Sequence, residues 1–554
     1  MSSDWKSHKT QAAIIVLLTI VAYLPALHGG FVWDDSSLIT ENSIIESSNG
    51  LSRIWLTSEP ADYYPITNSL WWLEWRLWDA RPIGCHIVSV LFHTVNVLLV
   101  WKILSRLKVP CAWFVALLFA IHPVNVGTVA WISEQKTVLS MVFYLIAVVF
   151  FLRFNEVNRW GWYGLSLCAF SLALLSKTAV VMLPVVLLDI TWWTNGRLLW
   201  KDFFGSVPFF ILAAIMGLVT IHFQHQHRID LGLTATSVSF ASRLAMAGSV
   251  PWFYLAKAVL PFNLAAVYPG WQITDPRWTS GLLGILLVAM VALFCWKRGT
   301  WGRPWLFGLA YFVIMLFPVL GFFDQTFYRF SAVADHWQYY SIIAPVTLIF
   351  AVGRRLGRPW NEVLGAVAIL VLATATWVRA GVYADNVTLW RDNVAKYPDA
   401  YVARQNLGYA LAKQGKLLEA IEHFERAARL KPGLAESHYN LGSALARVGQ
   451  TREAVREFEE ALRLEPNDAQ THNNLANVLL VLGDVAAALK HYEQAVRLEP
   501  GSSEVHCNLA IALEQSGRMS EARVQYEEAL RINPNLQEAQ NRLERLGFGR
   551  KLGS

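Results

Sequence analysis

One period of the C-terminal part of the chain reads NLGSALARVGQTREAVREFEEALRLEP, from Asn440 to Pro466. The same pattern recurs every 34 residues, and it is marked by Pro398, Pro432, Pro466, Pro500 and Pro534 and by Gly415, Gly449, Gly483 and Gly517. Small residues such as Gly442 and Ala454 let two helices approach closely, and Phe458 fills the space between them. The period therefore predicts a series of paired helices.

A 34-residue period of helix, turn and helix is the signature of the tetratricopeptide repeat. We predict such a domain over residues 383–554, with a half-repeat at 388–400, full repeats at 401–434, 435–468, 469–502 and 503–536, and a closing helix at 537–546. Repeats of this kind stack into a curved α-solenoid with a concave groove. Domains of this kind are more often protein-binding modules than enzymes, so we expect this one to bind protein.

The groove-lining helices carry an Asn at every thirty-fourth position: Asn406, Asn440, Asn474 and Asn508. An amide side chain offers a donor and an acceptor, which is what the backbone of an extended acceptor peptide requires. The alternative is that these amides only help the helices to pack. The sequence leaves both interpretations open.

The first 382 residues have a different chemistry. Of the whole chain, 55% is hydrophobic and only 16% is charged, whereas soluble domains are about one quarter charged. Apolar runs of membrane-spanning length, about 20 residues, are predicted at 11–27, 85–104, 110–127, 137–154, 160–176, 178–195, 205–222, 279–296, 304–320, 338–353 and 361–379. The 25 Trp agree with a membrane protein, because Trp gathers at membrane interfaces. The fold class is therefore all-α, a polytopic helix bundle followed by the α-solenoid.

Other classes are disfavoured. A net charge of +6 is small for 554 residues and gives no argument for a nucleic-acid partner. None of the five cysteines forms a CxxC pair, so neither a zinc site nor a disulfide framework is indicated.

Basic residues predict the orientation of the bundle. They gather in alternate connections, at Lys102, Arg106 and Lys108, at Arg153 and Arg159, at Arg197 and Lys201, at Lys297, Arg298 and Arg303, and at Arg354, Arg355 and Arg358. If all of these face the cytoplasm, the stretch 241–262 does not cross and eleven spans place the repeat domain outside. The first span is interpreted as an anchor rather than as a cleaved signal peptide.

The first outer loop, residues 28–84, begins with GGFVWDDSSLITEN, in which Asp34 and Asp35 follow the first span directly. Further along, Trp71, Trp75 and Trp78 share one face of a predicted helix. Trp and Arg on a short helix beside a span predict that this helix lies in the membrane interface.

Further polar residues gather in outer loops. The stretch IHPVNVGTVAWISEQKTVLS supplies His122, Glu134 and Lys136, LLSKTAVVMLP supplies Lys177, and DQTFYRFSAVADHWQYY supplies Arg329, Asp335, His336 and Tyr340. A carboxylate accepts a proton from an attacking hydroxyl, and cations stabilise a departing phosphate. Together these groups describe sugar transfer from a polyprenyl-phosphate carrier to an external acceptor. Taken singly, each has a plainer explanation, since a lone Lys snorkels and adjacent acidic residues often only begin a solvated loop.

The ordered series FVWDD, PITNSL, GCHIVSVLFHTVNVLL, HPVNVGTVAWISEQKTVLS and LLSKTAVVMLP, followed by tetratricopeptide repeats, resembles the transmembrane and tetratricopeptide-repeat O-mannosyltransferase family of the glycosyltransferase C superfamily. The resemblance covers nearly the whole chain. It implies a catalytic acidic motif at Asp34 and Asp35, dolichyl- or undecaprenyl-phosphate sugars as donors, inversion at the anomeric carbon, and a repeat domain on the active-site side that engages acceptor proteins.

The chain departs from the family block HPVHVEAVAWISERKDVLS at Asn125, Gly127, Gln135 and Thr137, and His336 stands where a later motif has Arg. Loss of an Arg at Gln135 weakens a phosphate site there, so we assign the donor phosphate to Lys136, Lys177, Arg329 and His336. Further site candidates are His122, Glu134, Asp335 and Tyr340. The donor's lipid tail is placed near Trp71 to Trp78.

The function expected is transfer of a mannose-like hexose to protein Ser or Thr hydroxyls selected by the repeats. No cofactor is required in this reading, and a divalent cation, Mg or Mn, at Asp34 and Asp35 is the lower-ranked alternative. The shortness of the chain favours a bacterial inner-membrane protein with Asp34, Asp35 and the repeats on the periplasmic side. The alternative function is a non-catalytic membrane scaffold that recruits periplasmic proteins through its repeats.

Overall fold

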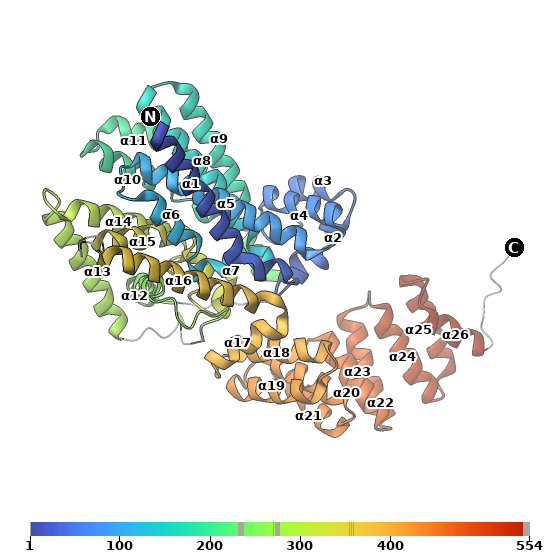
Figure 1. Cartoon of the computed structure of the whole chain (residues 1–554). Helices are drawn as coiled ribbons and strands as arrows, with labels where there is room; N and C mark the ends of the chain where they lie inside the picture. The colour runs from blue at the N-terminus through green and yellow to red at the C-terminus, as the bar shows by residue number, and fades with distance from the viewer. Residues whose placement is uncertain are drawn as a thin grey trace. The chain divides into compact units, whose positions relative to one another are not determined.

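The chain folds into two helical units. The computed structural model describes residues 2–230, 238–269, 271, 278–353, 355, 357 and 359–546. Within these ranges every regular element is a helix, and the chain divides into compact units at Met1–Tyr397 and Pro398–Ser554 (Figure 1). The predicted all-α architecture is confirmed.

The first unit is a bundle of apolar helices joined by short turns. Its α-helices are α1 (Ser2–Tyr23), α2 (Ser43–Glu46), α3 (Gly50–Leu56), α4 (Pro65–Trp78), α5 (Pro82–Arg106), α6 (Ala112–Ala120), α7 (Val126–Val129), α8 (Gln135–Val157), α9 (Trp160–Ser176), α10 (Leu183–Asn195), α11 (Trp200–Asp230), α12 (Phe240–Val259), α13 (Trp278–Trp296), α14 (Gly302–Leu316), α15 (Ile343–Gly353), α16 (Trp360–Gly381) and α17 (Asn386–Lys396).

Seven helical stretches of the described residues are long and apolar enough to cross a membrane: His8–His28, Pro82–Arg106, Ile132–Val157, Thr178–Asn195, Trp200–His227, Gly302–Val319 and Trp360–Ala384. The pair Ala112–Ala120 and Pro123–Val129, bent by 48°, is an eighth if it counts as one span. Trp160–Ser176, Ser280–Trp296 and Ile343–Gly353 are apolar but shorter. Each predicted span overlaps one of these stretches, whereas α12, over the doubtful segment 241–262, is not among them. The orientation stays a prediction, and two of its basic residues, Arg354 and Arg358, lie outside the described residues.

Two predicted spans differ in detail from the helices observed. The span 110–127 breaks at Pro123, which has no N–H to continue a helix, and the His122 ring accepts a hydrogen bond from the backbone N–H of Val124 (3.4 Å) to start a new turn. The span 338–353 was placed too early, because α15 begins only at Ile343 after a 3₁₀ turn at Asp335–Gln338.

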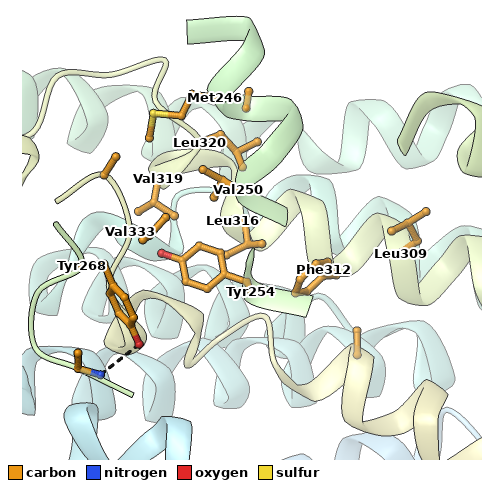
Figure 2. Close-up of a cluster of buried hydrophobic side chains, with 14 of the residues drawn as sticks. Met246, Val250, Tyr254, Tyr268, Leu309, Phe312, Leu316, Val319, Leu320 and Val333 are labelled. Carbon is orange, nitrogen blue, oxygen red and sulfur yellow. Dashed lines mark hydrogen bonds between the residues drawn. The ribbon is translucent and has the colours of Figure 1, made fainter. Parts of the chain in front are cut away.

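Helix α12 packs inside the unit. Val250 and Tyr254 of this helix form a buried cluster with Phe312 and Leu316 of α14 and with Val333 (Figure 2). Tyr254 has no exposed surface, and its hydroxyl donates to the carbonyl of Ala334 (3.2 Å). The apolar character of 241–262 is therefore explained by burial against α14.

The first outer loop packs back on the bundle. On α4 the buried side chains include Thr67, Trp71 and Glu74, which repeat at helical spacing. Trp78, by contrast, is 37% exposed. Trp71 is therefore packed inside the protein, whereas the location of α4 in the membrane interface stays a prediction.

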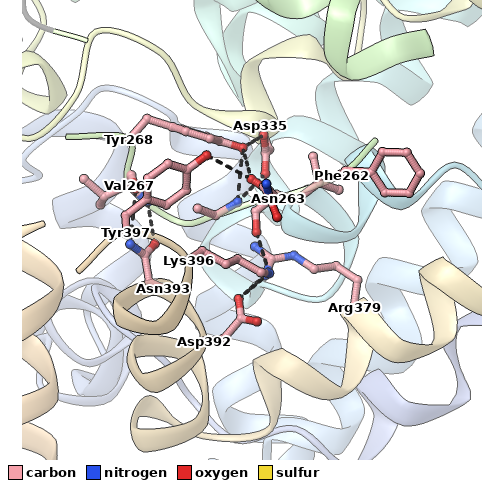
Figure 3. A network of polar contacts seen from close by, with 12 residues as sticks. Phe262, Asn263, Val267, Tyr268, Asp335, Arg379, Asp392, Asn393, Lys396 and Tyr397 are labelled. Carbon is pink, nitrogen blue, oxygen red and sulfur yellow. Dashed lines mark hydrogen bonds and ion pairs between the residues drawn. The ribbon is translucent and has the colours of Figure 1, made fainter. Parts of the chain in front are cut away.

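The boundary between the units lies after Tyr397, not after residue 382. Helix α17, predicted as a tetratricopeptide half-repeat, is fixed to the first unit by its polar side chains. The Asn393 amide bonds both the N–H of Val267 (2.9 Å) and its carbonyl (3.2 Å), and the Lys396 ammonium donates to the carbonyl of Leu264 (2.9 Å) (Figure 3). Contacts of the side chains, rather than the repeat period, decide where the unit ends.

The second unit is four helix pairs and a closing helix, at the predicted positions: α18 (Tyr401–Lys413), α19 (Leu417–Leu430), α20 (Ala435–Arg447), α21 (Thr451–Leu464), α22 (Ala469–Val481), α23 (Val485–Leu498), α24 (Ser503–Gln515), α25 (Met519–Ile532) and α26 (Gln537–Arg545). Gly408 is needed because a Cβ there would come within 2.8 Å of the Phe424 ring. Gly415 and its equivalents turn the chain at positive φ.

Candidate active site

The candidate site is organised by the segment from Trp131 to Thr137, which is buried throughout except for Lys136. A 3₁₀ turn at Ile132–Glu134 leads into the first turn of α8. The first N–H groups of a helix have no partner within the helix, so this turn presents donors to side chains from elsewhere. The two aspartates of the first outer loop bind here.

Asp35 and Asp34 bind the same residue in different ways. Asp35 has no exposed surface, and its two carboxylate oxygens accept hydrogen bonds from the backbone N–H groups of Ser133 (2.7 Å) and Val32 (2.8 Å). Asp34 is partly exposed, and one of its oxygens accepts a hydrogen bond from the Ser133 hydroxyl (2.8 Å). Asp35 therefore fixes the loop, and Asp34 is the carboxylate that a substrate can reach.

Burial raises the pKa of both carboxyl groups above their ordinary value. For Asp35 the pKa rises to about 8, and the neighbouring charge of Asp34 is the second cause. For Asp34 the pKa is raised by burial, while the Lys136 ammonium and the Ser133 hydroxyl oppose the rise. A base with a raised pKa is a stronger proton acceptor, which suits an attack by a hydroxyl.

Glu134, the residue after Ser133, binds the ammonium groups of two lysines. Its carboxylate lies 2.9 Å from the Lys177 ammonium and 3.5 Å from that of Lys136. Lys177 also donates to the hydroxyl of Thr137 (2.7 Å), which itself bonds Glu134. Two ammonium groups thus share one carboxylate that is only 3% exposed. Thr137, noted as a departure from the family, is part of this cluster.

His336 closes one side of the cluster. Its Nε2 lies 3.9 Å from the Glu134 carboxylate, and its ring meets that of Trp131 edge to face at 5.4 Å. Burial lowers the pKa of His336 to about 4, so the ring is neutral at pH 7 and offers a hydrogen bond rather than a charge. Tyr340 joins from the same stretch, because its hydroxyl bonds the Ser140 hydroxyl and the carbonyl of Thr137 (3.3 Å).

Three predicted site residues have other surroundings. The His122 ring bonds the Ala258 carbonyl (3.1 Å). Asp335 accepts hydrogen bonds from the Tyr268 hydroxyl (2.6 Å) and the Ala265 N–H (3.1 Å), in the network of Figure 3. Arg329 is exposed, and its guanidinium lies 4.2 Å from the centre of the Phe330 ring. His122 and Asp335 are thus engaged in holding the fold.

Sequence reasoning missed the anchor of the aspartate loop. Trp33 has a positive φ of 53° and stacks on Trp131 with ring centres 4.9 Å apart. Its N–H donates to the Asn386 side chain of α17 (2.7 Å), and Trp390 of the same helix meets its ring at 4.9 Å. The 34-residue period indicates only positions that recur along the repeats, so it did not indicate a role for Asn386.

Asp62 was also left out of the predicted site. Its negative charge acts on both Lys136 and Lys177, and its side chain is partly exposed. The lysines are bound by Glu134 and lie in the field of a second acidic group, Asp62.

Gln135 faces away from the lysines. Its amide accepts from the Trp71 indole N–H (2.9 Å) and donates to Glu74 (3.0 Å) and to the carbonyl of Cys85 (2.8 Å). All four groups are buried. Gln135 is thus occupied by this network, and the Lys136 and Lys177 cluster forms without it.

A divalent cation at the aspartate pair stays a prediction, and Asp34 is the carboxylate of the pair that is partly exposed. Both oxygens of Asp35 already accept backbone N–H groups, which leaves Asp34 as the one available carboxylate of the pair. In the part of the chain that the structure describes, no group of three or more His, Cys, Asp and Glu side chains is arranged to hold a metal.

The repeat asparagines are partly exposed, and three of their amide groups bond within the second unit. Asn406 donates to its own helix at the Val402 carbonyl (2.9 Å). Asn474 donates to the Tyr439 hydroxyl (3.1 Å) and Asn508 to the Asn473 side chain (3.0 Å), and each of these bonds joins neighbouring repeats. The packing role is thus visible, and a role in binding peptide stays a proposal.

Family models match parts of both units. Residues 62–223 match the family model described as dolichyl-phosphate-mannose-protein mannosyltransferase, and residues 408–449, 439–503 and 473–536 match tetratricopeptide repeat models. A solved structure of MamA is 22% identical, with a TM-score of 0.26, over 27% of this chain and 89% of that one.

Among curated proteins, a protein O-mannosyl-transferase of Caenorhabditis elegans is 23% identical over 76% of this chain and 62% of its own length. Protein O-mannosyl-transferase TMTC3 of Homo sapiens is 25% identical over 39% of this chain and 26% of its own length. The chain thus spans less than two thirds of these relatives. Together with the apolar helices and the repeats, the matches indicate a multi-pass membrane protein that is similar to the transmembrane and tetratricopeptide-repeat O-mannosyltransferases.

Proposed function

We propose that the chain transfers a mannose-like hexose from a polyprenyl-phosphate carrier to Ser or Thr hydroxyls of acceptor proteins. One observation carries the proposal. Ser133 binds the partly exposed carboxylate of Asp34 at 2.8 Å, and the next residue, Glu134, holds the Lys177 ammonium at 2.9 Å. A proton acceptor and a pair of cations are thus held by adjacent residues of one buried turn.

The reaction needs both groups. Asp34 takes the proton of the acceptor hydroxyl as its oxygen forms a bond to the anomeric carbon of the sugar. The bond from that carbon to the carrier phosphate breaks, and the phosphate leaves with the electron pair. Lys136 and Lys177 stabilise the negative charge that develops on it. Attack opposite to the leaving phosphate inverts the anomeric carbon.

Other members of the site position these groups. His336, as a neutral ring, donates a hydrogen bond to the lipid-linked sugar. Arg329, at the end of the 3₁₀ turn Thr326–Arg329 and outside the lysine cluster, is proposed to supply a further positive charge. The proposal uses no metal: the proton goes to Asp34, and the lysine ammonium groups supply the positive charge. Unchanged transfer after treatment with a chelator is the expected result.

The repeats select the acceptor in this proposal. The carbonyl oxygens of Asn406, Asn440, Asn474 and Asn508 are offered to the N–H groups of an extended peptide. We place Asp34 and the repeats on the periplasmic side of a bacterial inner membrane, since the basic connections favour that orientation. Replacing Asn440 and Asn474 by Ala should raise the KM for a whole acceptor protein. The KM for a short acceptor peptide should stay unchanged.

The decisive experiment compares two substitutions in the whole protein, with transfer measured from a labelled lipid-linked sugar. Asp34→Asn keeps an oxygen for the Ser133 hydroxyl but removes the base, so kcat should fall about 10²- to 10⁴-fold with unchanged folding. Asp35→Asn leaves one buried N–H without an acceptor, at a cost of about 1–3 kcal/mol in stability. Full activity of Asp34→Asn would reject the assigned base, and acceptor binding without any transfer by the unmodified protein would favour the scaffold alternative.

A further inference from the structure

The bundle contains an apolar cavity whose lining includes no residue of the acidic loop around Asp34 and Asp35. It measures about 430 Å³ and is lined by α5, α8, α10, α14 and α15, through side chains such as Leu104, Val148, Val186 and Leu348. This volume lies within the range of small-molecule sites, about 300–1,000 Å³. Nothing in the transfer reaction described above uses these residues.

One end of the cavity is basic and aromatic. Lys108 and Arg355 line it there, together with Trp193 and Trp301. All four residues lie at or beside helix ends: after α5, after α15, in the last turn of α10 and just before α14. These are the connections that the positive-inside rule assigns to the cytoplasm, and Trp side chains favour the same interfacial level.

The two cations have no acidic partner within the described residues. Lys108 and Arg355 are both exposed, and no carboxylate of that part of the chain forms an ion pair with either. Basic pockets between membrane helices on the cytoplasmic side are suited to anionic lipid head groups. The two positive charges at this end of the cavity therefore favour binding of an anion.

The depth of the cavity fits one leaflet. Its lining along α15 runs from Ile343 to Val352, which at 1.5 Å per residue is about 14 Å. Half of the hydrocarbon core of a bilayer is about 15 Å. At the inner end Tyr311 lines the cavity, and its hydroxyl donates to the carbonyl of Tyr340 (3.0 Å).

We infer that this cavity binds one anionic phospholipid of the cytoplasmic leaflet, with an acyl chain between α8, α14 and α15 and its phosphate against Lys108 and Arg355. The site is separate from the one that takes the sugar donor. Binding of this lipid would make the packing of α14 and α15 depend on the charge of the surrounding membrane. The inference does not depend on transferase activity.

Native mass spectrometry of the whole protein tests the inference. The protein is placed in nanodiscs of equal phosphatidylethanolamine and phosphatidylglycerol, and the lipid retained after release is identified. Lys108→Gln with Arg355→Gln should weaken retention of phosphatidylglycerol about 25-fold, since each basic residue contributes about fivefold. Ala351→Trp, which fills the cavity from its lining, should abolish retention. Arg298→Gln, an exposed residue outside the lining, is the control and should change nothing.

Three results would overturn the inference. These are equal retention in all variants, equal retention of the two lipids by the unmodified protein, and a retained polyprenyl phosphate in place of a phospholipid. Transfer activity is measured on the same samples, so a failure of the lipid site is distinguished from a failure of the proposed reaction.

Discussion

Replacement of Glu74 by Gln should remove a pH dependence of stability that this carboxyl group imposes. Glu74 is 3% exposed on the inward face of α4, and one of its oxygens accepts from the Gln135 amide at 3.0 Å. Its other oxygen is buried and has no partner among the described residues. Burial therefore disfavours the ionised form and raises the pKa of Glu74 from 4.5 to about 7.

The magnitude follows from linkage. The folded protein binds the proton of Glu74 more tightly than the unfolded chain, so stability is greatest below pH 4.5 and falls as pH rises through 7. The pKa difference between 4.5 and about 7 corresponds to about 3 kcal/mol, at about 1.4 kcal/mol per pKa unit. Glu74→Gln does not titrate, so its stability relative to the unmodified protein should improve by about 3 kcal/mol between pH 4 and pH 8.

The assay is equilibrium unfolding of the whole protein in mixed micelles at both pH values. Other titrating groups, Asp34 and Asp35 among them, are present in both proteins, so the difference between the two pH dependences isolates Glu74. Glu41→Gln, at an exposed position of the same loop, serves as the matched control. If Glu74→Gln shows the same pH dependence as the unmodified protein, the carboxyl is ionised without cost and the argument from burial is wrong.

Three further predictions concern other parts of the chain. Lys177→Met should lower kcat for transfer at least about 10²-fold, as removal of a group that stabilises transition-state charge does elsewhere, and this is measured with the labelled donor. Asn386→Ala should cost about 1–3 kcal/mol in unfolding experiments, because the Trp33 N–H loses its acceptor. The His472 ring shares a 2.9 Å contact between Nδ1 atoms with His491, whose pKa is lowered chiefly by burial. Stability from His491 is therefore present above about pH 6.5 and lost below it, and His491→Gln should flatten this loss in thermal unfolding.

The repeat unit could be predicted almost completely because each recurring small residue reflects a local contact between neighbouring helices. A Gly stands where the Phe424 or Phe458 ring leaves no room for a Cβ, and a Gly of positive φ turns the chain between the two helices of each pair. The same local logic located the membrane helices, since an apolar run of sufficient length has few alternatives to a buried helix or a span.

The orientation of side chains in short turns could not be predicted. Asp335 and His336 are neighbours in a 3₁₀ turn, in which successive residues point about 120° apart. His336 therefore reaches Glu134, whereas Asp335 bonds Tyr268. On α4 the sequence did not indicate that Trp71 is buried while Trp78 is 37% exposed.

The acidic pair shows why two adjacent aspartates follow the first span. Ser133 binds Asp35 through its backbone N–H and Asp34 through its hydroxyl, so one residue separates a structural carboxylate from an accessible one. Because Glu134 follows directly and gathers the lysines, the distance between base and cations is set within a single turn of backbone. The loop needs Asp35 to fix that turn before Asp34 has any chemical use. In the proposed reaction Asp34 takes the proton, and Asp35 holds the loop that carries it.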